Sequence, residues 1–191
     1  MLVSQLELIP QGGTAFLFKK AKTILRYPTF CVTDLGGTRV IGKAHFGYNS
    51  DILRPDSLQI EACRRYDSTL MADAQNRIGC MDASIKPLSE EMRMTGPAVT
   101  VDLPANDNLM LYKALSMAEP GDVLVVSTGG NQTRAVWGEL MNLSAQKIGI
   151  GGLVIDGMIR DGLAIRRQPL PVFCRGTIPA NVFKRGPGFV N

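Results

Sequence analysis

The spacing of apolar residues changes along the chain, and the change falls near residue 54. Before it, short β-prone segments are separated by Gly-Gly or Pro, which is typical of a small antiparallel hairpin or meander. After it, segments with helical spacing alternate with compact apolar runs. The pattern therefore predicts two parts, a β-prone N-terminal extension over residues 1–52 and an α/β domain over residues 53–191.

The second part carries clear signals for the starts and ends of helices. Asp56 or Ser57 can cap a first helix, Asp107 can cap a third, and Gly149 can end a fourth. The Leu and Met residues of the third helix fall on one face and are expected in the core. The predicted helices cover residues 54–66, 68–79, 107–118, 134–147 and 160–167.

Apolar, β-branched runs between these helices predict strands over residues 96–103, 122–127, 151–157 and 170–176. Strands that alternate with helices imply βαβ units and a mostly parallel central sheet. We expect an α/β domain with this sheet at its centre. Ligands of such sheets lie beyond the carboxyl ends of the strands, where the segments 128–134 and 156–161 can meet in one crevice.

Bulk composition narrows the classes of function. The 191 residues are 45% hydrophobic and 20% charged, which is ordinary for a soluble globular protein. A formal net charge of +4 is a mild basic excess, so nucleic-acid binding is not expected. No apolar run is long enough to span a bilayer, and the N-terminus lacks the basic start of a signal peptide. We therefore expect a cytoplasmic protein without a membrane partner.

Cysteine and histidine offer little chemistry. Cys31, Cys63, Cys80 and Cys174 are scattered without a CxxC pair, so a zinc site is not indicated and reduced, mostly buried thiols are expected. The single histidine, His45, lies in an apolar-flanked segment and is expected to be packed or at the surface rather than catalytic.

A glycine-rich loop follows the second predicted strand and opens the fourth predicted helix. Glycines allow close approach of the backbone, and unpaired N–H groups at a helix start favour an anion. The loop matches neither the P-loop nor the G-x-G-x-x-G pattern, and a tight strand-to-helix turn is the alternative interpretation. The candidate anion-binding residues are Gly130, Asn131, Gln132, Thr133 and Arg134.

Glu139 lies in the helix after this loop, and Arg160 and Asp161 follow the next strand. Each can be an ordinary surface charge, and the Arg-Asp pair can be an exposed ion pair at a helix cap. Their spacing is more informative, because twenty residues that include a strand separate Glu139 from Arg160.

The acidic-x20-Arg-Asp pattern resembles the signature of class II pyruvate aldolases that act on 4-hydroxy-4-methyl-2-oxoglutarate and 4-carboxy-4-hydroxy-2-oxoadipate. Their superfamily includes the regulator of ribonuclease activity A. Other stretches that resemble this family are Asp73-Ala74, 96–101, 107–110, 121–126 and 152–161. The resemblance covers roughly residues 55–191 and implies a three-layer α/β domain of the swivelling β/α type.

The resemblance implies a divalent metal, Mg²⁺ or Mn²⁺, that Asp161 ligates directly and Glu139 holds through water. It places Arg160 against the keto oxygen of pyruvate and the N–H groups of 130–134 against the carboxylate. Retro-aldol cleavage builds negative charge on an enolate oxygen, which a metal and a guanidinium stabilise. Magnesium suits few protein ligands because it keeps several waters.

The resemblance also implies a small 2-oxo acid substrate, oxaloacetate decarboxylation as a further activity, and a homo-oligomer, either a trimer or a hexamer. A binding protein without catalysis, like the ribonuclease-regulating branch of the superfamily, is the alternative. Two departures from the family stand out. Ala164 occupies a position that is often acidic, and the family's C-terminal part is expected to be missing after residue 191.

Overall fold

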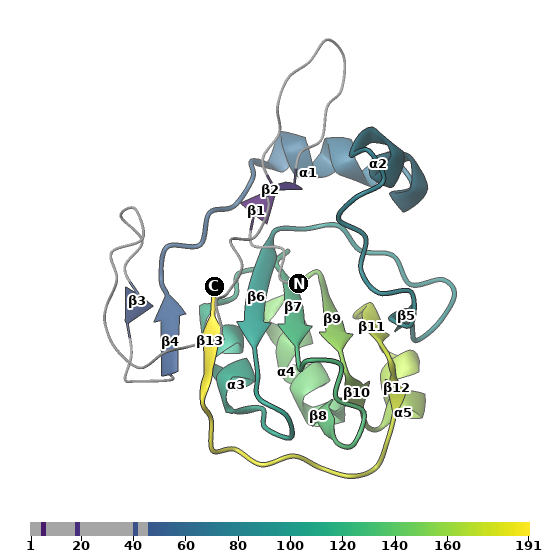
Figure 1. The fold of residues 1–191 in the computed structure, drawn as a ribbon. Coiled ribbons are helices and arrows are strands. Elements are labelled where there is room, and N and C mark those ends of the chain that lie inside the picture. Colours follow the sequence, from purple (N-terminus) through teal and green to yellow (C-terminus); the bar gives the residue numbers. More distant parts are fainter. Residues whose placement is uncertain (1–4, 7–17, 20–39, 42–45) are drawn as a thin grey trace.

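The computed structural model describes residues 5–6, 18–19, 40–41 and 46–191. Eight of the described strands form the main sheet, in the order β3-β4-β13-β6-β7-β9-β11-β5 (Figure 1). These strands are β3 (Val40–Ile41), β4 (Phe46–Asn49), β5 (Lys86–Pro87), β6 (Ala98–Asp102), β7 (Val123–Ser127), β9 (Gly152–Asp156), β11 (Val172–Cys174) and β13 (Gly188–Val190).

The remaining strands form two small sheets. One is the parallel sheet β12-β10-β8, and the other is the antiparallel pair β1-β2. Their bounds are β1 (Gln5–Leu6), β2 (Phe18–Lys19), β8 (Ala135–Trp137), β10 (Met158–Ile159) and β12 (Gly176–Thr177). The helices are α1 (Ser57–Arg64), α2 (Ser68–Ala74), α3 (Leu109–Met117), α4 (Glu139–Ile148) and α5 (Gly162–Arg166).

Strands β6, β7, β9 and β11 run parallel and form the centre of the main sheet. Helices α3, α4 and α5 lie in the three connections between them, which confirms the expected α/β class with a mostly parallel sheet. One row of paired residues crosses all four strands and is fully buried, namely Val99, Leu124, Leu153 and Val172. This row belongs to the same core as residues of α3, α4 and α5.

The opposite face of the sheet is covered by the segment between α2 and β6. Alternate residues of a strand point to opposite faces, so Val125 and Val154 face away from that core. They line a cavity with residues of 79–85. Met94 packs against Gly152, where an added Cβ would lie 2.4 Å from its sulfur. The segment 79–94 thus lies against this face of β7 and β9, opposite the core.

The C-terminal strand β13 pairs with two strands that are distant in the sequence. β13 pairs antiparallel with β6 and parallel with β4, and β3 pairs antiparallel with β4 at the sheet edge. The described strands β3 and β4 of the predicted 1–52 extension are therefore part of the main sheet. Figure 1 shows β4 and β13 side by side, far from β11 and β5 at the other end of the order.

Two predicted helix boundaries are wrong. The first helix has the expected N-cap, Asp56, which accepts from Gln59 N–H in a capping box. The second ends at Ala74 rather than at residue 79, because Asn76 and Arg77 adopt positive φ angles that a helix does not contain. The fourth begins at Glu139 rather than at residue 134, because β8 pairs with β10 first.

A buried ion pair ties the chain before α1 to the start of β7. Arg54 donates from Nε and Nη2 to the two carboxylate oxygens of Asp122, at 2.9 and 2.7 Å. Asp122 is 1% exposed and also accepts from Glu119 N–H. The hydrogen bond and the charge of Asp122 raise the pKa of Arg54. Both carboxylate oxygens are therefore satisfied inside the fold.

Candidate active site

A short strand places the Arg-Asp pair beside the start of α4. The chain leaves β9 through Gly157 and enters β10, where Ile159 pairs with Trp137 of β8. The N–H of Arg160 then donates to the carbonyl oxygen of Trp137 at 2.9 Å. The small sheet β12-β10-β8 thus brings Arg160 next to Trp137, which lies two residues before the start of α4.

Gly138 permits this close approach. A Cβ atom at this position would lie 2.9 Å from both Arg160 Nε and Asp161 Oδ2. No side chain fits there without moving a charged group of the Arg-Asp pair. The glycine is therefore a packing requirement of the site rather than a flexible point in the chain.

Asp161 lies between a helix start and a guanidinium. Its Oδ2 accepts from the N–H of Glu139 at 3.1 Å and lies 3.4 Å from Arg160 Nε. Its backbone has a φ of 58°, in the left-handed region, at the N-cap of α5. The side chain is still 41% exposed, so the carboxylate can also meet a ligand from solvent.

Glu139 is the first residue of α4 and lies in the same corner. Its side chain is half-buried, and its Oε1 accepts from Gln168 Nε2 at 3.4 Å. The structure therefore brings together the three residues that the spacing singled out, Glu139, Arg160 and Asp161.

A cavity of about 320 Å³ opens beside the Arg-Asp pair. Glu139 is not among its lining residues, which are Leu88, Arg160, Asp161, Gly162, Leu163, Arg166, Thr177, Ile178 and Pro179. Two guanidinium groups and one carboxylate give this wall a net positive charge. Such a wall favours a small anion with an apolar part.

The first turn of α4 adds donors to this corner. The first intrahelical bond of α4 is donated by the N–H of Asn142. The N–H groups of Leu140 and Met141 precede it, so they have no partner inside the helix. Together with the positive end of the helix dipole they form a place where a carboxylate can bind.

The predicted anion loop does not open a helix. Residues 130–134 are followed by β8, so their N–H groups are not the unpaired donors of a helix start. None of them lines the cavity of the Arg-Asp pair in the described part of the chain. The helix-start donors that the sequence placed at 130–134 lie instead at the start of α4.

Side chains within the loop are used to hold its shape. Asn131 Nδ2 and Thr133 Oγ1 both donate to Asn106 Oδ1 at 2.8 Å. Arg134 donates to the carbonyl of Asn181 at 2.6 Å. Gly129 and Gly130 have φ angles of 65° and 73°, which explains the glycine pair in this turn. Gln132 is exposed. The tight-turn interpretation therefore fits the loop better than an anion cradle.

Sequence reasoning missed several residues of this corner. Gly138 and Gln168 contact the predicted residues, and Arg166 and Thr177 line the cavity. Only Gly138 carried a local signal, because it immediately precedes Glu139. The others are brought in by α5 and β12, whose positions depend on the tertiary structure.

A second charged cluster lies at the carboxyl ends of β9 and β11. Arg175 Nε donates to Asp156 Oδ1 at 2.5 Å, and Arg175 Nη2 lies 3.2 Å from Asp82 Oδ2. Hydrogen bonds from the Ser84 hydroxyl and N–H, together with Arg175, lower the pKa of Asp82 to about 2. The hydrogen bond to Asp156 raises the pKa of Arg175. The cluster links the segment 79–85 to the carboxyl ends of β9 and β11.

The donor set of the Arg-Asp corner suits a weakly held, hydrated cation. Among the described residues, His, Cys, Asp and Glu nowhere gather in a group of three that could hold a metal ion. Asp161 and Glu139 offer carboxylate oxygens in one corner. Mg²⁺ can be held by one or two carboxylates when water molecules complete its coordination shell. These residues therefore fit Mg²⁺ or Mn²⁺ and not a closed zinc site.

The described thiols are free. Cys63 and Cys174 are buried, which raises the pKa of both, and Cys80 is exposed. Cys31 and His45 lie outside the described residues. Within the described part of the chain, none of the helices is long and apolar enough to cross a membrane.

The structure is thus an α/β fold with a candidate anion site at the start of α4. The chain belongs to the RraA-like family, described as Aldolase/RraA, whose model matches residues 62–191. The assignment agrees with the resemblance seen in the sequence.

Several relatives carry the name of an aldolase. A protein of Halalkalibacterium halodurans, provisionally named 4-hydroxy-4-methyl-2-oxoglutarate aldolase, is 41% identical over 128 residues. The match covers 67% of this chain and 61% of that protein, so the chain spans less than two thirds of this relative. A Burkholderia multivorans protein with the same provisional name is 29% identical over 67% of this chain and 76% of its own length.

Solved structures of similar fold carry other names. The RNA-processing inhibitor RraA from Thermus thermophilis superposes with a TM-score of 0.60 at 26% identity, covering 65% of this chain and 76% of that one. A Geobacillus kaustophilus protein titled S-adenosylmethionine: 2-dimethylmenaquinone methyltransferase gives a TM-score of 0.60 at 28% identity, covering 65% and 78%. The fold is thus shared by proteins named as enzymes and as regulators.

Proposed function

We propose that this protein is an aldolase-like lyase that cleaves a 4-hydroxy-2-oxo diacid to pyruvate and a second oxo acid. The observation that carries the proposal is the corner in which Gly138 lets Asp161 and Arg160 meet the start of α4. The provisional aldolase names of the two relatives support the same reaction class.

The substrate's 2-oxo acid end would bind across the start of α4. Its carboxylate would accept from the N–H groups of Leu140 and Met141, where the helix dipole favours a negative charge. Its 2-keto oxygen would face the guanidinium of Arg160. The apolar surface of Leu163 and Ile178 in the cavity wall would contact the carbon chain.

Arg160 would then stabilise the charge that forms during cleavage. The bond between C3 and C4 breaks, its electron pair forms the enolate of pyruvate, and the proton of the 4-hydroxyl group leaves as the new carbonyl forms. A proton returning to C3 completes pyruvate. A guanidinium remains charged at any working pH, so it can stabilise the enolate oxygen throughout.

Asp161 would hold a divalent cation directly, with Glu139 contacting it through water. When bound, Mg²⁺ or Mn²⁺ would supply Lewis-acid stabilisation of negative charge on oxygen. The same arrangement would support decarboxylation of oxaloacetate, which also yields the pyruvate enolate. We also propose a homo-oligomer, a trimer or a hexamer.

A regulator that binds another protein without catalysis is the second candidate. Its support is the fold shared with the RNA-processing inhibitor and Ala164 at a position where the aldolases often carry an acid. The two candidates differ in catalysis, because the aldolase would release pyruvate and the regulator would not.

The deciding experiment is pyruvate release from 4-hydroxy-4-methyl-2-oxoglutarate in the presence of Mg²⁺, followed with lactate dehydrogenase. We expect turnover by the wild type, and loss of turnover after addition of EDTA or in the Asp161→Ala variant. Turnover that Asp161→Ala leaves unchanged would exclude the proposed mechanism. Absence of turnover in a folded wild type would favour the regulator.

A further inference from the structure

A chain of side-chain hydrogen bonds leads from the core to Glu139. The indole Nε1 of Trp137 donates to Asn142 Oδ1 at 3.0 Å. Asn142 Nδ2 donates to Gln168 Oε1 at 2.8 Å, and Gln168 Nε2 donates to Glu139 Oε1 at 3.4 Å. Gln146 Nε2 also donates to Gln168 Oε1, at 2.6 Å. The chain thus joins β8, α4 and the residue that follows α5 by two positions.

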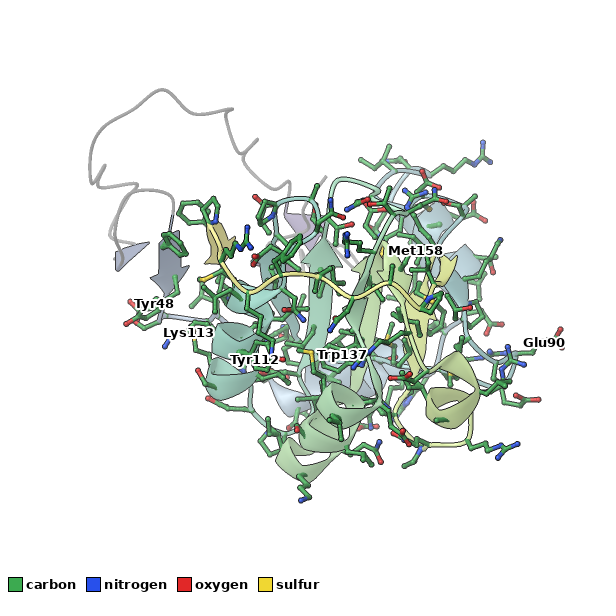
Figure 2. All side chains as sticks on the ribbon, turned by 90° about the horizontal axis from the view of Figure 1, so that it is seen from below. Tyr48, Glu90, Tyr112, Lys113, Trp137 and Met158 are labelled. Carbon is green, nitrogen blue, oxygen red and sulfur yellow. The ribbon has the colours of Figure 1, made fainter. Side chains whose placement is uncertain are left out.

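The direction of this chain is fixed at its buried end. Trp137 is 1% exposed and Asn142 is fully buried, and Figure 2 shows Trp137 among the packed side chains at the centre. An indole N–H can only donate, so Asn142 must present its oxygen to Trp137 and its NH₂ group to Gln168.

The same argument then fixes Gln168. Its Oε1 receives two donors, one from Asn142 and one from Gln146, so its NH₂ group must face Glu139. If the Gln168 amide were reversed, its NH₂ group would face the NH₂ groups of Asn142 and Gln146. Its oxygen would then face the carboxylate of Glu139. The orientation of the Gln168 amide at Glu139 is thus decided by Trp137, at the other end of the hydrogen-bond chain.

We propose that Gln168 is a positioning residue, which holds the carboxylate of Glu139 in place through this one-way chain of hydrogen bonds. The inference rests on the proposed function for the role of Glu139, while the hydrogen-bond chain stands independently of it. Outer partners of this kind change metal affinity or activity by about 10- to 100-fold.

The first test reads the hydrogen bond itself in the unliganded protein. We expect Glu139→Ala to shift the side-chain NH₂ resonances of Gln168 in a ¹⁵N–¹H spectrum. Glu139→Gln should largely restore them, because its oxygen can still accept. Glu90→Ala is the matched control, since Glu90 points outward at the edge of the molecule (Figure 2). Gln168 resonances that do not respond to Glu139→Ala would overturn the proposal.

The second test asks whether Gln168 acts through Glu139. Gln168→Leu should lower kcat by about tenfold, at the low end of such effects, and leave KM within about twofold. In a Glu139→Ala background the same substitution should cause no further fall. Gln146→Leu should have a smaller effect, because Asn142 still orients Gln168. A further tenfold fall in the double variant would show that Gln168 supports the fold rather than Glu139.

Mg²⁺ affinity, measured by calorimetry on the same variants, should follow the same non-additive pattern. The indole resonance of Trp137, the single tryptophan of the chain, checks that each variant keeps its core. A wild type that releases no pyruvate would refute the proposed function, and the Gln168 resonances would still decide the positioning role.

Discussion

The backbone N–H of Glu139 donates to the carboxylate of Asp161 at 3.1 Å, although 22 positions separate the two residues in the chain. This one hydrogen bond joins the start of α4 to the N-cap of α5. It also helps to bring Glu139, Arg160 and Asp161 together in one corner of the structure. Substitutions in this corner, and in the ion pairs that hold the surrounding elements, should have distinct effects on turnover and on stability.

Gly138→Ala should damage the site more than the fold. The added Cβ would lie 2.9 Å from Arg160 Nε and Asp161 Oδ2, so both groups must move. We expect pyruvate release to fall at least about tenfold, and the free energy of unfolding to fall by about 1–3 kcal/mol, as for other overpacked positions. Enzyme assays and urea unfolding measure the two effects.

Gly129→Ala is the control for this substitution. No atom lies within 4 Å of its added Cβ, but its φ of 65° strains an alanine. We expect a loss of about 1 kcal/mol in stability with turnover kept. Equal losses of turnover in both variants would show that the close approach at Gly138 is not needed for activity.

Arg160→Lys should lower kcat by about 10²–10³-fold, the usual cost of removing one donor from a developing oxyanion. The charge is kept, but a lysine ammonium lacks the planar fork and the reach of the guanidinium. The measurement is steady-state pyruvate release. Arg167→Lys, at the exposed C-cap of α5, is the control and should match the wild type. Full activity in Arg160→Lys would contradict the role given to the guanidinium.

Asp122→Ala should destabilise the fold without touching the site. It leaves Arg54, 23% exposed, without its bidentate partner. Breaking a fully buried pair costs about 3–5 kcal/mol, so a loss of about 2–3 kcal/mol is expected for this partly exposed arginine. Urea unfolding measures it.

The exposed pair Arg64–Glu61 on α1 provides the comparison for Asp122→Ala. Arg64→Met removes an i,i+3 pair whose side chains are 52% and 58% exposed. Its loss should cost no more than about 0.5 kcal/mol. A similar small loss in Asp122→Ala would show that the buried pair contributes little to stability.

Asp82→Asn should change how stability depends on pH. The pKa of Asp82 is lowered from 3.8 to about 2, so the folded state favours the charged form. Its stabilising effect is therefore fully present above pH 3.8 and is lost as the pH falls towards 2. The wild type should have the higher Tm at about pH 5, and its advantage over Asp82→Asn should shrink towards about pH 2.

Ser84→Ala tests the cause of that shift, because hydrogen bonds from Ser84 are its largest contributors. This variant should reproduce part of the change, since the Ser84 N–H remains. A Tm difference between the wild type and Asp82→Asn that is the same at both ends of this pH range would show that the Asp82 pKa is not lowered in solution.

Local signals in the sequence were enough to predict the α/β class and to single out the charged residues of the candidate site. Apolar runs such as 122–127 predict strands buried on both faces, and local caps such as Asp56 and Gly149 predict helix ends, because both signals depend on neighbours in the chain. The twenty-residue spacing between Glu139 and Arg160 is likewise a property of the linear chain, so it singles out these residues without any knowledge of their contacts.

The position of the helix-start donors depends on contacts between distant parts of the chain. The glycines at 129–130 predicted a helix start at 134, but hydrogen bonds from β8 to β10 and to Ala180 delay the helix to Glu139. Those partners are distant in sequence, so no local pattern reveals them. For the same reason Gln168 could not be predicted: its role depends on an amide orientation fixed by a tryptophan on another element.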